Sequence, residues 1–249
     1  MSLVIGHRGA KGHYRENSLR SIRIAKELGC HIIEIDVRRS IDGIFFLQHD
    51  EKVEFLDLKT GNSFETRIED EEYVNIIKWG YEQMLFAVMH ITDKCNVYLD
   101  LKIGKKEEND LEYMKKYADE LIKMLEDFEN IGEKIYIASF NKILMGYLST
   151  RYFDKKYVYG LILEENEELN DSDIFNEYYY FYGLNYRSDN LRKITLKIEK
   201  GGKYAFLYTI NIVEEMKNLK ERNIIYHGLI SDFPDRVKLF YESLRYDFE

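Results

Sequence analysis

Short apolar runs recur along the whole chain, and each has the length and the residue types of a β-strand. Nine such runs lie at residues 3–5, 32–37, 44–47, 97–101, 135–138, 157–163, 178–182, 204–208 and 224–229. Runs of this length that are rich in Ile, Val, Leu and Tyr favour strands over helices. The hydrophobic pattern therefore predicts nine strands spread over the full sequence.

Longer segments between these runs carry apolar residues at helical spacing. Apolar side chains recur every three residues from Leu19 to Leu28, and Gly29 then ends the pattern. The clearest helices are predicted at 17–28, at 111–128 and at 212–222. A last helix follows Pro234, which suits a first helical turn, and should bury Val237, Phe240, Tyr241 and Leu244.

Alternating strands and helices predict a parallel sheet. The dipeptide Asp42-Gly43 is a hairpin signal, so the run 44–47 should be an extra strand antiparallel to 32–37. The remaining eight strands, in a chain of 249 residues, match a (β/α)₈ TIM barrel with an extra β-hairpin strand near the N-terminus. A doubly wound open sheet is the alternative. The sequence contains no Pro/Gly/Ser-rich linker, so one domain over 1–249 is expected.

Charge and composition exclude several classes of protein. The net charge of −9 and the absence of a basic stripe argue against a nucleic-acid partner. No apolar stretch is long enough for stable membrane insertion, and the start lacks the basic region of a secretion signal. Neither Cys30 nor Cys95 has a CxxC partner. A cytoplasmic protein is expected, and the oligomeric state is not indicated.

Three carboxylates lie near the ends of two predicted strands. Glu34 and Asp36 are two residues apart on one strand, so their side chains point to the same face. Asp100 ends another strand. In a barrel the C-terminal strand ends carry the chemistry, so the three should meet there. Carboxylates without cysteine suit Mg²⁺, Ca²⁺ or Mn²⁺ better than zinc.

Cations and histidines follow the same strand ends. His7 and Arg8 come after the first strand, His49 follows the hairpin strand, and Lys102 lies two residues beyond Asp100. Together with the carboxylates, they form a plausible environment for a metal ion and a phosphate ester. Each residue alone has an ordinary alternative: a strand-end histidine, a surface carboxylate, or a salt bridge between Asp100 and Lys102.

Nine short motifs occur in order along almost the whole chain. They are Gly6-His7-Arg8-Gly9, Glu16-Asn17-Ser18, Glu34-Ile35-Asp36-Val37, Asp42-Gly43, His49-Asp50, Asp100-Leu101-Lys102, Ser139-Phe140, Tyr208-Thr209-Ile210-Asn211 and Ser231-Asp232-Phe233-Pro234. This ordered set resembles the glycerophosphodiester phosphodiesterase family. The resemblance implies a (β/α)₈ barrel that hydrolyses glycerophosphodiesters to glycerol 3-phosphate and an alcohol, with one divalent cation, Mg²⁺ or Ca²⁺, or alternatively Mn²⁺.

The resemblance also implies a role for each site residue. The metal ligands would be Glu34, Asp36 and Asp100; the general acid and base would be His7 and His49; and the phosphate oxygens would be held by Arg8 and Lys102. Asn17 is a candidate substrate contact and equally a helix N-cap. Tyr208 stands where the family has tryptophan and would keep an aromatic wall beside the substrate. Water and the substrate's own glycerol 2-hydroxyl are both compatible nucleophiles.

Several positions depart from the family pattern. Asp100 stands where the family usually has glutamate. The related phospholipases D of the spider-venom type resemble this chain in having an Asp-x-Lys arrangement. The shorter side chain requires a shift of the ion or the strand, or an intervening water, so direct ligation by Asp100 stays open. Residues 51–94 lack the family's usual signals and are expected to be a short variable segment over the active site. Near the end of the chain, capping is the expected role of Asn211 with Glu214, and of Asp232.

Two other functions remain as alternatives. A phospholipase D-like hydrolase of lysophospholipids would use the same barrel with a hydrophobic entry surface beside its rim. A non-catalytic barrel that binds a phosphodiester is the third reading. The presence of both His7 and His49 argues against it, because binding alone needs no acid/base pair.

Overall fold

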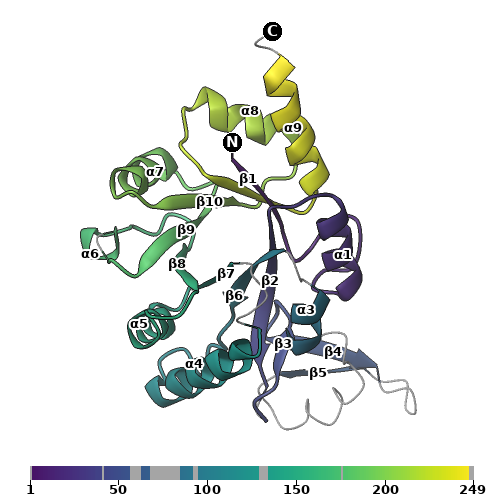
Figure 1. Ribbon diagram of the computed structural model, residues 1–249, viewed down its shortest axis with the longest axis vertical. Coiled ribbons are helices and arrows are strands. Elements are labelled where there is room, and N and C mark those ends of the chain that lie inside the picture. The colour runs from purple at the N-terminus through teal and green to yellow at the C-terminus, as the bar shows by residue number, and fades with distance from the viewer. Residues whose placement is uncertain are drawn as a thin grey trace.

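Eight parallel strands close into a barrel (Figure 1). The computed structural model describes residues 2–40, 42–56, 63–67, 85–91, 95–128, 134–174 and 176–246. In chain order the barrel strands are β1 (Leu3–Gly6), β2 (Ile32–Arg39), β6 (Asn96–Leu101), β7 (Ile135–Ser139), β8 (Val158–Leu163), β9 (Tyr179–Asn185), β10 (Tyr204–Tyr208) and β11 (Gly228–Ser231).

The first strand closes the ring. It pairs in parallel with the last strand, where Val4 lies opposite Leu229, and with β2, where Ile5 lies opposite Ile32. An open sheet would leave β1 or β11 as an edge, so the doubly wound alternative is wrong. The extra strand is also confirmed: β3 (Phe45–Leu47) lies outside the ring and is antiparallel to β2.

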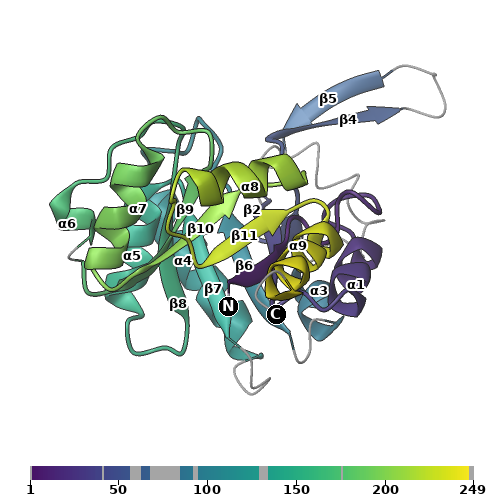
Figure 2. The same cartoon turned by 90° about the horizontal axis from the view of Figure 1, so that it is seen from above.

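Helices surround the barrel on its outer side (Figures 1 and 2). They are α1 (Leu19–Glu27), α3 (Leu85–Ile91), α4 (Leu111–Glu126), α5 (Lys142–Arg151), α6 (Asp171–Ile174), α7 (Leu191–Lys200), α8 (Val213–Glu221) and α9 (Pro234–Tyr246). The helices predicted from spacing agree with α1, α4, α8 and α9. Val237 and Phe240 of α9 are buried as expected, whereas Tyr241 and Leu244 are partly buried.

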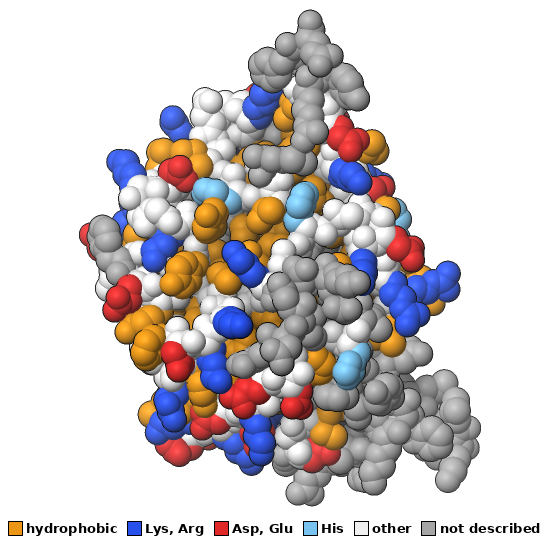
Figure 3. All heavy atoms as spheres, viewed as in Figure 1, with side chains coloured by type: hydrophobic (Ala, Val, Ile, Leu, Met, Phe, Trp, Pro, Cys, Tyr) orange, Lys and Arg blue, Asp and Glu red, His pale blue; other side chains and the backbone are white. Residues whose placement is uncertain are grey.

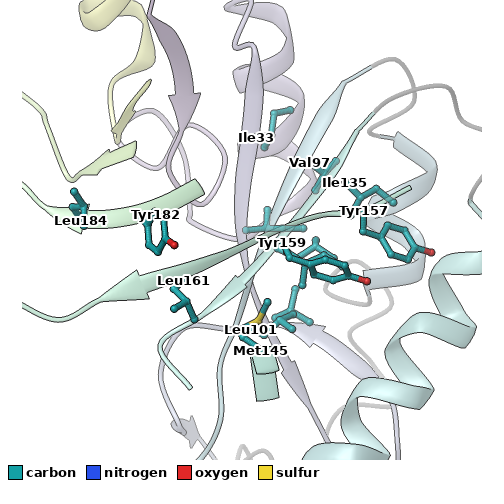
Figure 4. Packing of buried hydrophobic residues seen from close by; sticks show 14 of the residues in the cluster. Ile33, Val97, Leu101, Ile135, Met145, Tyr157, Tyr159, Leu161, Tyr182 and Leu184 are labelled. Atoms are coloured by element: carbon teal, nitrogen blue, oxygen red, sulfur yellow. The ribbon is translucent and has the colours of Figure 1, made fainter. Parts of the chain in front are cut away.

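Alternation along the strands separates two apolar clusters. The larger one lies between the strands and the helices and includes Ile33 and Val97 (Figure 4). The smaller one fills the inside of the barrel and includes Ile32 and Tyr98. Because successive side chains on a strand point to opposite faces, Glu34 and the residues in step with it face the inside.

One predicted strand is displaced. The apolar run 224–229 was expected to be a strand throughout, but β11 begins only at Gly228. Asn223 has a left-handed backbone, and the amide of Ile224 donates to the carbonyl of Leu219, so the start of the run ends helix α8 instead. Inside the barrel a Cβ at Gly228 would lie 2.9 Å from the side-chain end of Ile5, so a larger residue at the start of this strand would push that side chain aside.

The expected variable segment 51–94 lies only partly within the described residues. Two antiparallel strands, β4 (Lys52–Leu56) and β5 (Ser63–Arg67), form a hairpin that projects away from the barrel (Figure 2). Helix α3 then returns to pack near β3 and α1. Among the described residues, no helix has both the length and the apolar character that crossing a membrane requires.

Phe181 is central to the inner cluster and provides a test of its contribution. It is fully buried, with ring centroids 5.2 Å from Tyr98 and 5.1 Å from Phe206. Phe181→Ala should lower the free energy of unfolding by about 3–5 kcal/mol, because it leaves a cavity in the barrel. Urea denaturation measures the change.

Tyr180 is the matched control, because it precedes Phe181 on the same strand and is half exposed. Tyr180→Ala should cost about 1 kcal/mol or less. Equal losses in the two variants would contradict an inner cluster that stabilises the barrel.

Candidate active site

A cleft of about 410 Å³ opens at the C-terminal ends of the barrel strands. Eight of the nine predicted site residues line it: His7, Arg8, Glu34, Asp36, His49, Asp100, Lys102 and Tyr208. They come from strands far apart in the sequence that closure of the barrel places side by side. The ninth, Asn17, lies buried behind the cleft wall.

A second hollow, of about 780 Å³, lies at the opposite end of the barrel. Aromatic side chains such as Tyr136, Tyr204 and Phe206 line it, and Figure 3 shows hydrophobic side chains gathered over the middle of this face. Among the described residues that line it, none is a carboxylate. The predicted metal ligands therefore belong to the smaller cleft.

The three carboxylates come together as predicted. One oxygen from each of Glu34, Asp36 and Asp100 lies within 4.8 Å of the others, and all three residues are buried. Asp36 and Asp100 lie directly opposite each other in the pairing of β2 with β6. The Oδ1 atom of Asp100 is buried and has no hydrogen-bond partner among the described residues. A set of carboxylate oxygens with one left unsatisfied fits a hard divalent cation.

Two protein cations hold this acidic cluster. Lys102 Nζ lies 2.6 Å from Asp100 Oδ2 and 3.2 Å from Asp36 Oδ1. Arg8 Nε lies 3.0 Å from Asp36 Oδ2 as an ion pair that lacks hydrogen-bond geometry. Arg8 Nη1 also donates to both carboxylate oxygens of Glu16, at 2.9 and 3.0 Å. These contacts hold the Arg8 guanidinium between the acidic cluster and Glu16, in the loop between β1 and α1.

Burial and these cations move the pKa values of the carboxylates apart. Burial raises the pKa of Glu34 well above its usual range, and the charges of Asp36 and Asp100 raise it further. Burial also raises the pKa of Asp100, although Lys102 opposes it. Burial alone would raise the pKa of Asp36 too, but Lys102 and Arg8 outweigh it and lower this pKa to about 2. Asp36 is therefore the carboxylate that stays charged most firmly.

A tight turn after β1 explains the His7-Arg8-Gly9 motif. Arg8 and Gly9 both have left-handed backbone conformations, with φ of 49° and 84°. This turn aims the Arg8 amide at Glu34 Oε2, at 2.7 Å, and the Gly9 amide at the Glu34 carbonyl, at 3.0 Å. A Cβ at Gly9 would lie 2.5 Å from the hydroxyl of Ser21. The turn thus requires glycine and orients one of the three carboxylates.

Each of the two histidines has a carboxylate partner. His7 Nδ1 lies 2.6 Å from Asp232 Oδ1, and His49 Nδ1 lies 2.7 Å from Asp50 Oδ1. A carboxylate at Nδ1 favours the tautomer that carries its proton there, which leaves Nε2 as the nitrogen available for proton transfer. The buried Arg38 also donates twice to the backbone carbonyl of His49, at 3.0 and 2.8 Å, and so fixes the loop that carries it.

Asp232 and Asn211 belong to the site, and the expected capping role of Asn211 with Glu214 is wrong. Asn211 Nδ2 donates to Asp232 Oδ2 at 2.7 Å, opposite the oxygen that binds His7. The N-cap of α8 is Ile212, and it is Glu215 rather than Glu214 whose side chain accepts from the Ile212 amide, as well as from the amide of Asn211. Both residues follow the ends of barrel strands, and this position was the sequence signal that could have identified them.

Asn17 positions a carboxylate. Its Nδ2 donates to Asp36 Oδ2 at 2.8 Å, and its Oδ1 accepts from the Asp36 amide at 3.1 Å. The N-cap of α1 is Ser18, so the alternative reading of Asn17 as the cap is wrong. Asn17 does not line the cleft, and its contact with substrate stays a prediction.

Tyr208 lies on the cleft wall as expected. Its hydroxyl donates to the carbonyl of Leu163 at 2.6 Å, and its ring meets the ring of Phe140 edge to face, with centroids 6.4 Å apart. Burial raises the pKa of Tyr208 above its ordinary value, and nearby acidic groups raise it further. The phenol therefore keeps its proton and forms part of an aromatic wall.

The barrel and this cleft define a class of protein. A (β/α)₈ barrel is suited to act on phosphate esters when carboxylates, cations and histidines paired with carboxylates lie at the C-terminal ends of its strands. The chain belongs to the glycerophosphoryl diester phosphodiesterase family, whose model matches residues 7–236. The expected enzyme class, a phosphoric diester hydrolase, is thereby confirmed.

Known proteins of similar length support this assignment. A glycerophosphodiester phosphodiesterase from Caldanaerobacter subterraneus subsp. tengcongensis is 22% identical over 247 residues, which are 95% of this chain and 96% of that protein. A phosphodiesterase from Oleispira antarctica, solved with its product sn-glycerol-3-phosphate, has a TM-score of 0.78 at 17% identity and covers 96% of both chains. A glycerophosphodiester phosphodiesterase from Thermotoga maritima has a TM-score of 0.70 at 23% identity, covering 96% of this chain and 99% of that one. At these identities the structural likeness establishes the fold.

The carboxylate of Asp232 should make stability depend on pH. Burial alone would raise its pKa, but hydrogen bonds from His7 and Asn211 lower it below the ordinary value of 3.8. A lowered pKa in the folded state stabilises the protein above the ordinary pKa, and this contribution is lost as pH falls through the folded value. The melting temperature of the wild type should exceed that of Asp232→Asn most at pH 5–7, and the difference should shrink toward about pH 3. A difference that stays constant over this range would contradict the interpretation.

Proposed function

We propose that this chain hydrolyses glycerophosphodiesters to glycerol 3-phosphate and an alcohol, and that it needs one divalent cation. Family membership supports the reaction class. The proposed metal requirement and histidine roles rest on one observation. The acidic cluster and two histidines, each with a carboxylate partner, lie in the same cleft. We also propose that residues 1–249 form one catalytic domain, with 51–94 as a short variable segment over the active site. The cytoplasmic location stays a prediction.

The metal would be held by Glu34, Asp36 and Asp100. Their buried oxygens suit Mg²⁺, Ca²⁺ or Mn²⁺, and the unpartnered Asp100 Oδ1 supports direct ligation by the shorter side chain. When bound, such an ion neutralises phosphate charge and stabilises the additional charge of the transition state. Asn17 would hold Asp36 in place through its two hydrogen bonds.

The phosphate would be held by Arg8 and Lys102. A phosphodiester carries a negative charge that repels an incoming oxygen nucleophile, and fixed cations reduce this repulsion. Both side chains line the cleft next to the carboxylates. Lys102 is largely buried, and its pKa is raised: burial alone would lower it, but Asp100 and Asp36 outweigh that effect. Lys102 therefore stays protonated at neutral pH.

The two histidines would transfer the protons. One removes the proton of the attacking hydroxyl, from water or from the glycerol 2-hydroxyl, and the other protonates the leaving alkoxide. Attack by the 2-hydroxyl would first form a cyclic phosphate, which water then opens to glycerol 3-phosphate. Asp232 would keep His7 oriented and stabilise its protonated form, and Asp50 would do the same for His49. This pairing also supports catalysis over simple binding, because a binding barrel needs no oriented bases.

The first test is metal-dependent turnover. Purified protein should release glycerol 3-phosphate from glycerophosphodiesters when Mg²⁺, Ca²⁺ or Mn²⁺ is present. EDTA should abolish the release, and excess cation should restore it. Activity that persists in EDTA would contradict the metal requirement, and no turnover with any of these ions would overturn the function. Choline as the product, with lysophosphatidylcholine as the preferred substrate, would support the phospholipase D-like alternative.

The second test addresses the histidines. His7→Ala and His49→Ala should each reduce kcat by about 10²–10⁴, because each variant loses one proton transfer. His13→Ala is the matched control: His13 also pairs with a carboxylate, Asp235 at 2.7 Å, but does not line the cleft. Thermal melts of all variants establish that they fold. Wild-type kcat in His7→Ala would remove this residue from the proposed mechanism.

A further inference from the structure

The rim of the cleft has two chemically different halves. The side chains from β1, β2 and β6 supply the acidic cluster and its two cations. Over β7 to β10 the lining is mostly aromatic and amide, with Phe140, Asn185, Tyr186 and Tyr208, and Arg187 is the only formally charged residue among those lining this half. We call this second half the Arg187 wall. The acidic cluster and the two cations that would hold the phosphate lie on the other half of the rim. The Arg187 wall therefore faces a group attached to the phosphate rather than the phosphate itself.

The aromatic faces of the Arg187 wall already carry protein cations. Lys102 Nζ lies 5.2 Å from the ring centroid of Phe140, and the guanidinium carbon of Arg187 lies 5.3 Å from that of Tyr186. The third ring, Tyr208, meets Phe140 edge to face. An aromatic site for a quaternary ammonium offers open ring faces to the ligand. Here a cationic substituent would meet Lys102 and Arg187 instead.

Arg187 is an exposed residue, and its neighbours orient its side chain. Its Nε donates to the hydroxyl of Tyr186 at 2.9 Å, and this hydroxyl in turn donates to Glu215. The amide of Arg187 donates to Asn185 Oδ1 at 3.0 Å. Within the described part of the chain, no residue accepts a hydrogen bond from the two terminal nitrogens of Arg187. These nitrogens remain available to a ligand, and their direction is set by the bonds at Nε and the backbone.

Carboxylates also lie near the wall without lining it. Glu215 accepts from Tyr186, Glu165 accepts from Asn185 Nδ2 at 3.3 Å, and the charges of Glu164, Glu167 and Glu165 raise the pKa of Tyr208. None of these carboxylates is among the described lining residues, so Arg187 is the formally charged residue that this half of the lining presents to the cleft. The wall therefore presents hydrogen-bond donors, one of them a cation, to whatever occupies this half.

We infer that the Arg187 wall selects diesters whose alcohol is hydroxyl-rich and carries no positive charge, with Arg187 as the specificity-determining residue. This inference rests on the proposed function and adds the substrate class to it. The guanidinium nitrogens donate to alcohol hydroxyls, and Asn185 provides a further polar contact. A choline group would bring a positive charge against two fixed cations and would bind more weakly.

The experiment compares two diesters that share glycerol phosphate and differ in the alcohol. The wild type should have a kcat/KM for glycerophosphoglycerol at least about tenfold above that for glycerophosphocholine. Arg187→Gln should reduce this ratio about tenfold to a hundredfold, mainly through the KM for glycerophosphoglycerol, because hydrogen bonds from a charged donor are lost. Arg187→Lys should restore part of the ratio. Arg192→Gln, an exposed arginine on α7 outside the cleft, should keep the wild-type ratio.

Two outcomes would overturn the inference while the proposed function stands. One is that the wild type cleaves both diesters and cleaves glycerophosphocholine equally well or better. The other is that Arg187→Gln loses activity equally on both substrates, a result that would place the shared glycerol at the wall. If neither diester is cleaved, the proposed function fails. Calorimetric binding of the same two diesters to the wild type and Arg187→Gln then decides the inference by itself, since the binding preference should follow the same order.

Discussion

The balance of charge at the end of the barrel is the constraint on which the site depends. Glu34, Asp36 and Asp100 are buried within 4.8 Å of one another, an arrangement that burial and repulsion both oppose. Lys102 and Arg8 offset part of this cost. With all three carboxylates ionised, three negative and two positive charges leave one negative charge. A divalent cation would turn this into one positive charge. The cluster would then match the single negative charge of a phosphodiester.

Asp100 shows how this cluster accommodates a shorter side chain than the family's usual glutamate. Its two oxygens have separate surroundings: Oδ2 contacts Lys102 at 2.6 Å, and the buried Oδ1 has no hydrogen-bond partner in the described part of the chain. Asp36 lies directly opposite Asp100 in the pairing of β2 with β6. The distance between the two carboxylates is therefore set by the strand register as well as by the length of the side chains. A missing methylene therefore leaves the three carboxylates close enough to share an ion.

The sequence predicted the features that depend on local spacing. Residues two apart on β2 and β6 share a face whatever the rest of the fold does, and Asp42-Gly43 specifies a hairpin by itself. The errors came from contacts between distant segments. His7 and Asp232 are 225 positions apart, and their pairing depends on β1 closing the ring against β11. The run after Asn223 looked like a strand because it is apolar, but its first residues end α8.

The two halves of the rim are joined by one series of hydrogen bonds. Arg187 contacts Tyr186, Tyr186 contacts Glu215, and Glu215 accepts from the amide of Asn211. Asn211 then holds Asp232, which holds His7. Glu215 also accepts from the amide of Ile212, the N-cap of α8, so the first turn of this helix helps to orient both the residue that faces the alcohol and one histidine. A barrel enzyme can change its substrate by changing its loops. In this chain, however, a change at the start of α8 would move the Arg187 wall and the His7–Asp232 pair together.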